Sequence, residues 1–93
     1  MQGTIGRCGI DFAQSARKHR IGRARVRQVI EDPVAELRLP GGEGFDDRLV
    51  FLGDDTTGRA LEVMAVPLID GLLVIHAMDL RAKWRPQYEE GKR

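Results

Sequence analysis

Two histidines are the side chains of this sequence best suited to proton transfer. An imidazole exchanges a proton near neutral pH, so His19 and His76 can each act as a general acid or base. Arginine and lysine side chains can hold a phosphate beside them. The candidate catalytic set therefore combines these histidines with Arg59, Arg81 and Lys83. Proton-transfer groups together with cations could carry out phosphodiester chemistry.

Each histidine also has a simpler interpretation. A strand histidine such as His76 is often structural and satisfied by a hydrogen bond. His19, near the end of an expected helix, can interact with the last helix carbonyls. Both alternatives remain open from the residues alone.

Other chemistries find little support in the sequence. The single cysteine, Cys8, cannot form an internal disulfide, and the histidines lack the paired spacing of a zinc site. The glycines form no phosphate-binding loop, and few aromatic residues are present for base stacking. We expect no metal, no small-molecule cofactor and a reducing, cytoplasmic setting.

The length of 93 residues predicts one domain, residues 1–93, with residues 1–10 as a loose leader. A hydrophobic share of 42% is enough for a folded core. The longest apolar run lies around 71–75 and is far shorter than the ~20 residues of a membrane span. We expect no membrane partner.

The net charge of +1 conceals a strong asymmetry. Residues 7–28 contain seven basic residues and one acid, whereas residues 31–62 contain nine acids and three arginines. A dense basic segment is typical of a surface that binds a polyanion such as RNA. The alternative is a solvated helix surface neutralised by the protein's own acids. The expected RNA-binding residues are Arg17, Lys18, Arg20, Arg23 and Arg27.

The patterning predicts an α+β fold with two N-terminal helices, a four-stranded antiparallel meander and a C-terminal helix. The first helix would begin at Asp11, and the second would begin at Gly22, continue through 23–31 and end at Asp32-Pro33. Asp79 would cap the last helix, which Pro86 must kink or restart. The apolar segments 34–39, 48–53, 59–68 and 72–78 predict the strands.

Turn chemistry sets the expected registers. With Asp70-Gly71 as a two-residue hairpin loop, His76 lies opposite Ala65. Ala65 in turn would face Asp47, so an acid and an imidazole would share one sheet face. Arg59 would lie at the other end of its strand, near Arg81.

Several short motifs together resemble the BrnT-type toxins of bacterial type II toxin–antitoxin pairs, which have a RelE-like ribonuclease fold. The resemblance extends roughly from Phe12 to Glu90. Its motifs are Lys18-His19-Arg20-Ile21, Val29-Ile30-Glu31-Asp32-Pro33, Arg48-Leu49-Val50-Phe51-Leu52-Gly53, Thr57-Gly58-Arg59-Ala60-Leu61-Glu62-Val63, Val74-Ile75-His76-Ala77-Met78 and Tyr88-Glu89-Glu90.

The resemblance implies a metal-independent RNA-cleaving toxin that a cognate antitoxin protein wraps. It also implies that His19 and Arg59 lie in or near the active groove. The chain departs from the family pattern at Arg20, where the family usually has glycine. At 76–78 it has His-Ala-Met where the family usually has Ser-Ala-Arg, and Arg81 and Lys83 can supply the missing charge.

Two further function classes remain open. A non-catalytic module could use the basic segment to bind RNA or a protein partner. An inactive regulator derived from a toxin would also fit the change at Met78.

Overall fold

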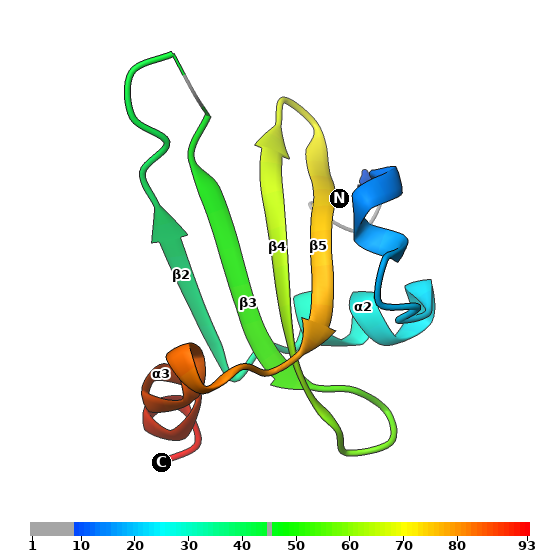
Figure 1. Ribbon diagram of the computed structural model, residues 1–93, viewed down its shortest axis with the longest axis vertical. Coiled ribbons are helices and arrows are strands. Elements are labelled where there is room, and N and C mark those ends of the chain that lie inside the picture. Colours follow the sequence, from blue (N-terminus) through cyan, green and yellow to red (C-terminus); the bar gives the residue numbers. More distant parts are fainter. Residues whose placement is uncertain (1–8, 45) are drawn as a thin grey trace.

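The structure, a computed structural model, describes residues 9–44 and 46–93 and is an α+β fold with a five-stranded mixed sheet (Figure 1). Strands β2 to β5 form an antiparallel meander, and β1 adds to β5 in parallel, giving the order β1-β5-β4-β3-β2. The strands are β1 (Ile10–Phe12), β2 (Ala35–Leu39), β3 (Arg48–Asp54), β4 (Ala60–Leu68) and β5 (Gly71–Asp79). The helical segments are η1 (Gln14–Arg17), α2 (Arg23–Glu31), η2 (Ala82–Trp84) and α3 (Arg85–Gly91).

The expected fold of two N-terminal helices ahead of four antiparallel strands is wrong at the N-terminus. In place of a helix from Asp11, the chain forms β1 and the short 3-10 turn η1. The N–H of Leu72 donates to the carbonyl of Gly9 (2.7 Å), and that of Ala13 donates to the carbonyl of Val74 (2.8 Å). Pairing with the edge of β5 satisfies these backbone groups, so tertiary contact overrides a weak local helix preference.

Residues 1–8, including Cys8, lie outside the described residues. The expected leader of residues 1–10 is too long, because Ile10 is buried and belongs to β1.

The C-terminal helix begins later than its expected cap. Asp79 is the last residue of β5, and the helical turn η2 precedes α3. Pro86 lies in the first turn of α3, where a helix needs no N–H donor. The second expected helix is α2, which spans Arg23–Glu31.

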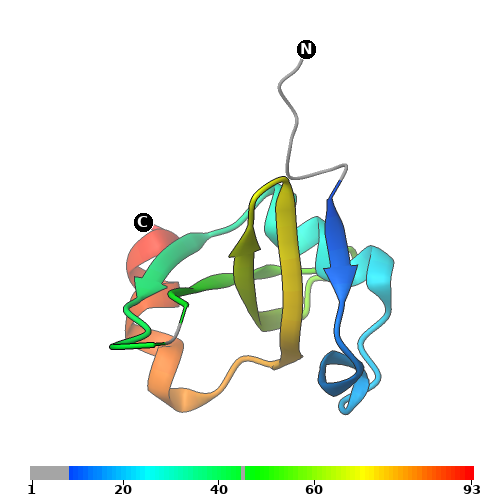
Figure 2. The same cartoon turned by 90° about the horizontal axis from the view of Figure 1, so that it is seen from above.

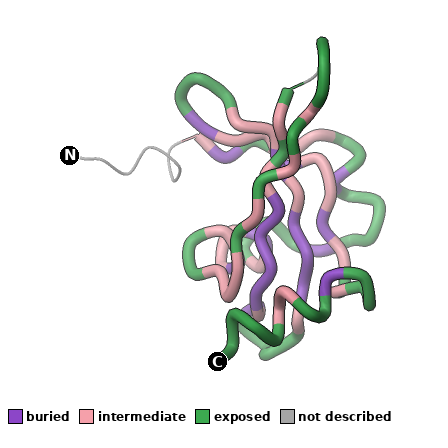
Figure 3. Tube along the Cα trace, turned by 90° about the vertical axis from the view of Figure 1, so that its left-hand side faces the viewer, coloured by how far each residue is buried: buried purple, intermediate pink, exposed green. Residues whose placement is uncertain are grey.

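The sheet carries a hydrophobic cluster on each face, and the buried segments run along its central strands (Figure 3). On one face, Val26 and Val29 of α2 pack with Val63 and other apolar residues of β4 and β5. On the other face, Trp84 packs with Val50 and Leu52 of β3. Figure 2 shows α2 and α3 at opposite ends of the sheet. The open part of the second face, over β4 and β5, is where a site can form.

Asp55 ties α2 to the β3–β4 turn. Its buried carboxylate accepts hydrogen bonds from Arg25 Nε (2.7 Å), from the N–H and hydroxyl of Thr57 (2.8 and 2.7 Å) and from the N–H of Arg59 (3.0 Å). These bonds, from Thr57 above all, hold the pKa of Asp55 well below its usual range.

Among the described residues, no helix combines the length and apolar character needed to cross a bilayer.

The close approach of β1 to β5 yields a stability prediction. A Cβ added at Gly71 would lie 2.1 Å from the carbonyl oxygen of Gly9, a contact that only backbone movement can relieve. We expect Gly71→Ala to lower the free energy of unfolding by about 1–3 kcal/mol in urea titrations. Gly22→Ala is the matched control, because a Cβ at Gly22 meets nothing within 4 Å. Equal stabilities of the two variants would contradict this packing.

Candidate functional site

The β4–β5 hairpin determines which face His76 occupies. Leu68 pairs with Gly71, so the turn residues are 69 and 70 rather than the expected 70 and 71. Met64 pairs with His76 while Ala65 pairs with Val74, which leaves Ile75 as the extra residue of a β-bulge. A bulge moves every later side chain to the opposite face of the sheet. His76 therefore shares a face with Met64, and not with Ala65 as expected.

The expected row of Asp47, Ala65 and His76 does not form. Ala65 pairs with Leu49, and Asp47 precedes β3. The carboxylate of Asp47 instead accepts hydrogen bonds from Arg38 Nη1 (2.9 Å) and from the N–H of Gly41 (3.0 Å). Its role is to fasten the β2–β3 loop, and these bonds, from Gly41 first, lower its pKa.

The bulge also brings His19 to His76. The hydroxyl of Ser15 in η1 donates a 2.8 Å hydrogen bond to the carbonyl of Ile75, the bulged residue. The chain leaves η1 through a turn in which Arg20 takes φ 59°, a left-handed conformation that costs a side-chain-bearing residue about 1–2 kcal/mol. The centroids of the His19 and His76 rings lie 6.0 Å apart in an edge-to-face arrangement. Two histidines that are 57 positions apart in sequence thus form one pair.

Glu62 is a buried carboxylate that holds this site together. Its side chain is 1% exposed. One oxygen accepts from the N–H of Arg81 (2.8 Å), and the other accepts from Arg81 Nη2 (2.6 Å) and Nε (2.9 Å). The second oxygen also lies 3.1 Å from His76 Nε2. Arg81 and His76 together supply the hydrogen bonds that compensate for the burial of the charge of Glu62.

The ionisation of Glu62 defines the tautomer of His76. Burial acts to raise the pKa of Glu62, but the hydrogen bonds from Arg81 and His76 outweigh it and the pKa lies below its ordinary value. An ionised carboxylate only accepts hydrogen bonds, so Nε2 of His76 carries the proton. In the neutral ring, Nδ1 is then the basic atom. The side chain of His76 is 26% exposed and His19 is exposed, so solvent or substrate can reach the pair.

The five expected catalytic residues are only partly brought together. His19 lies against His76, and Arg81 reaches His76 through Glu62. Arg59 forms a two-bond ion pair with Asp79, one of them 2.6 Å, and does not contact the histidines. The ammonium of Lys83 lies 5.1 Å from the centre of the Trp84 ring.

The expected RNA-binding residues are distinguished by having no acidic partner. Within the described ranges, no carboxylate forms a salt bridge with any of Arg17, Lys18, Arg20, Arg23 or Arg27, whereas Arg25, Arg59 and Arg81 are all paired. Arg23 stacks its guanidinium 5.2 Å above the ring of Phe12. All but the partly buried Arg27 are exposed. Their positive charge is therefore directed to solvent on η1, α2 and the turn between them.

Sequence reasoning overlooked Glu62. Its signal was present, because Glu62 is the single charged residue of the strand segment 60–68 and interrupts an apolar run. A lone acid in a buried strand requires partners, which the sequence does not identify.

The described residues contain no group of three or more His, Cys, Asp or Glu side chains arranged to hold a metal ion. The cation already present at the site is the guanidinium of Arg81.

Comparison of the chain with protein-family models, curated proteins and solved structures found no match in any of the three. Function is therefore inferred from the residues of the site themselves.

The Glu62 network predicts a pH-dependent stability. A carboxylate whose pKa is lower in the folded than in the unfolded chain stabilises the fold above its ordinary value of 4.5, and this contribution is lost as pH falls through the folded-state pKa. We expect Glu62→Gln to lower the free energy of unfolding by about 1–3 kcal/mol at pH 7. The difference from wild type should shrink as urea titrations are repeated at lower pH. Glu89→Gln, in an exposed pair with Arg85, is the control and should change little. A Glu62→Gln difference that stays constant with pH would contradict the network.

Proposed function

We propose that this chain is a metal-independent endoribonuclease, the toxin component of a type II toxin–antitoxin pair acting in the cytoplasm. The observation that carries the proposal is the pair of imidazoles 6.0 Å apart, one held by a buried carboxylate and the other exposed. The resemblance to BrnT-type toxins supports the same reaction and adds the toxin role and a cognate antitoxin protein as partner.

His76 is the general base in this mechanism. With Nε2–H donating to Glu62, Nδ1 can accept the proton of an RNA 2′-hydroxyl. The freed 2′-oxygen attacks the adjacent phosphorus and forms the O2′–P bond. Glu62 fixes the ring and stabilises the positive charge that His76 gains, as a carboxylate does beside a catalytic imidazole.

His19 is the general acid. In its protonated form it donates to the 5′-oxygen as the P–O5′ bond breaks, which leaves a 2′,3′-cyclic phosphate and a 5′-hydroxyl. Arg81 is the positioning cation: Nε and Nη2 are bonded to Glu62, and the remaining guanidinium nitrogen can face the phosphate. Arg59 and Lys83 are further cations near the last helix, although the Asp79 pair offsets the charge of Arg59.

The unpaired basic residues supply RNA affinity. RNA carries a phosphate at each nucleotide, and arginine forms two-bond contacts with phosphate oxygens. Only RNA has the 2′-hydroxyl that this reaction needs as nucleophile. The basic surface on η1 and α2 begins next to His19, so it can guide a strand to the histidine pair.

A non-catalytic RNA-binding module is the second candidate function. It is favoured by the same unpaired basic residues together with the neutralisation of Arg59 and Arg81 by acids. In this case RNA binds and stays intact.

Cleavage of RNA in the presence of EDTA separates the two functions. We expect wild-type protein to cut RNA with chelator present and to leave 2′,3′-cyclic phosphate ends, detectable by end-labelling. His76→Gln keeps a donor for Glu62 but loses the base, and should reduce kcat/KM by about 10²–10⁴-fold. His19→Ala should have an effect of the same order, and Arg93→Ala, at the exposed C-terminus, should have none. Wild-type kcat/KM should depend on pH in a bell shape.

Activity lost to EDTA, or retained in both histidine variants, would contradict the mechanism. Intact RNA bound by the wild type would favour the binding module. The toxin role has its own readout, since expression of the wild type but not of His76→Gln should arrest bacterial growth.

Salt dependence tests the basic surface independently of cleavage. Removal of one cation that neutralises a phosphate should reduce the slope of log K against log salt by about 0.7 for single-stranded RNA. We expect this reduction for Arg23→Ala, measured by fluorescence anisotropy in the His76→Gln background. Arg85→Ala, whose arginine pairs with Glu89 on α3, should leave the slope unchanged. Equal slopes for all three proteins would contradict RNA binding at this surface.

A further inference from the structure

Strand β2 is an open edge of the sheet. It lies at the end of the order β1-β5-β4-β3-β2, and among the described residues no segment pairs with its outer side (Figure 1). The N–H of Val34, just before β2, donates to the carbonyl of Leu52 in β3. The backbone groups of Leu52 therefore face β2, where its register partner is Ala35. Because backbone groups alternate along a strand, those of Ala35, Leu37 and Leu39 face β3, and those of Glu36 and Arg38 turn to the open side. Such an edge offers hydrogen bonds to a further strand.

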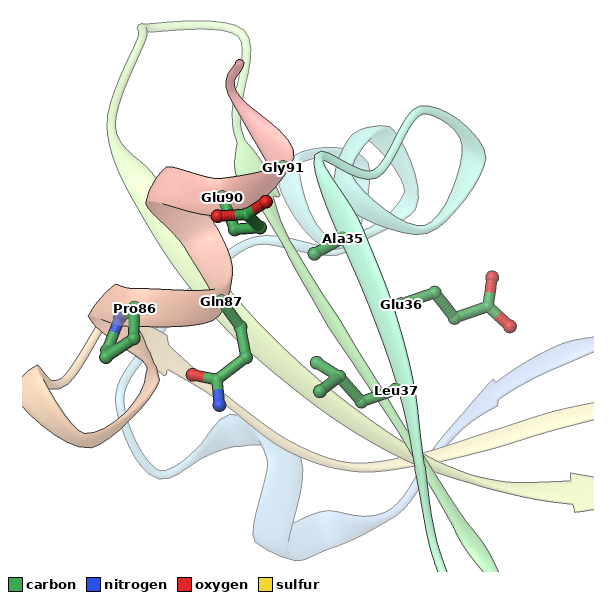
Figure 4. A pocket seen from close by; sticks show the side chains of 7 residues that line it. All are labelled: Ala35, Glu36, Leu37, Pro86, Gln87, Glu90 and Gly91. Atoms are coloured by element: carbon green, nitrogen blue, oxygen red, sulfur yellow. The ribbon is translucent and has the colours of Figure 1, made fainter.

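A groove beside this edge is also uncovered. It lies between β2 and α3 with a volume of about 530 Å³, and Ala35, Leu37 and Pro86 are among its lining (Figure 4). Figure 4 shows Ala35 and Leu37 directed toward α3, whereas Glu36 points away from it. The side-chain oxygen of Gln87, which also lines the groove, is buried without a hydrogen-bond partner in the described part of the chain. An occupant that brings both apolar side chains and a donor would complete this surface.

The sequence of β2, Ala-Glu-Leu-Arg-Leu, is complementary to itself in one arrangement. If two copies pair antiparallel about Leu37, each Glu36 lies opposite Arg38 of the other copy, and each Ala35 lies opposite Leu39. The charges attract across both pairs, and the smallest side chain faces a large one. Parallel pairing in register would instead set Glu36 against Glu36, which is repulsive.

We propose that this chain forms a symmetric dimer by antiparallel pairing of β2 with β2 of a second copy. The two sheets become one continuous sheet, and the interface is isologous, so the same residues of both copies form it. Leu37 and Leu39 of each copy lie on the α3 side and cover the groove of the other. Glu36 and Arg38 pair across the opposite face. The proposal uses no residue of the histidine site and does not depend on the proposed function.

The charge pattern provides the experiment. Wild-type protein should elute with twice the 10.4 kDa mass of the chain in size-exclusion chromatography with light scattering. Glu36→Arg places two like-charged pairs in the interface and should raise the dimer Kd by about tenfold or more. Arg38→Glu should do the same. An equimolar mixture of the two variants should form dimers again, because the arginine placed at 36 in one variant then faces the glutamate placed at 38 in the other, and Arg38 faces Glu36 in the second pair.

Glu31→Arg makes the same charge change at an exposed residue of α2 and should leave the dimer intact. Circular dichroism checks that the variants fold, since Arg38 also bonds Asp47 within its own chain. A chain that is monomeric at every concentration would overturn the proposal. So would a dimer unaffected by Glu36→Arg, or a mixture of the two variants that stays monomeric.

Discussion

The carboxylate of Glu62 cannot remain buried without partners, and meeting that requirement organises one side of the molecule. Removing an ionised carboxylate from water costs several kcal/mol unless hydrogen bonds replace the water. Arg81 replaces it with its backbone N–H and its side chain, so the chain must turn back over the sheet directly after β5. The turn delivers η2 and α3 to the second face, where Trp84 closes the smaller hydrophobic cluster. The same carboxylate also orients His76.

The bulge at Ile75 in β5 places His76 within hydrogen-bond distance of Glu62. If Ile75 were paired regularly and β5 had no bulge, His76 would lie on the face covered by α2, among the apolar residues of the main cluster. With the bulge, it is on the open face with Glu62, and the carbonyl of Ile75 is free to accept from Ser15. Bulges are frequent next to active sites because they redirect a side chain without disturbing the rest of the sheet. Here the bulge fixes both members of the histidine pair.

The distribution of charge separates structural from available cations. Arginines bonded to acids, such as Arg25 with Asp55 and Arg59 with Asp79, hold loops and strand ends in place. Arg17 on η1 and Arg23 and Arg27 on α2 have no such partner in the described structure and contribute to a basic surface on a nearly neutral chain. At the opposite edge of the sheet, β2 alternates apolar and charged side chains. The two surfaces lie at different ends of the sheet, so binding at one does not obstruct the other.

The sequence by itself determined the features that depend on near neighbours. The range of α2 and the approximate strands of the meander follow from local patterns, and residue chemistry alone selects the two histidines as candidates for proton transfer. Only the tertiary structure decided that the segment from Asp11 forms a strand and a 3-10 turn, because the edge of β5 offers hydrogen bonds that no local pattern reveals. It also decided the site, since the bulge at Ile75 shifts β5 by one residue and so reverses the face of every later side chain. Glu62 is conspicuous as a lone acid in an apolar strand, but its bonds to His76 and Arg81 exist only after that shift is made.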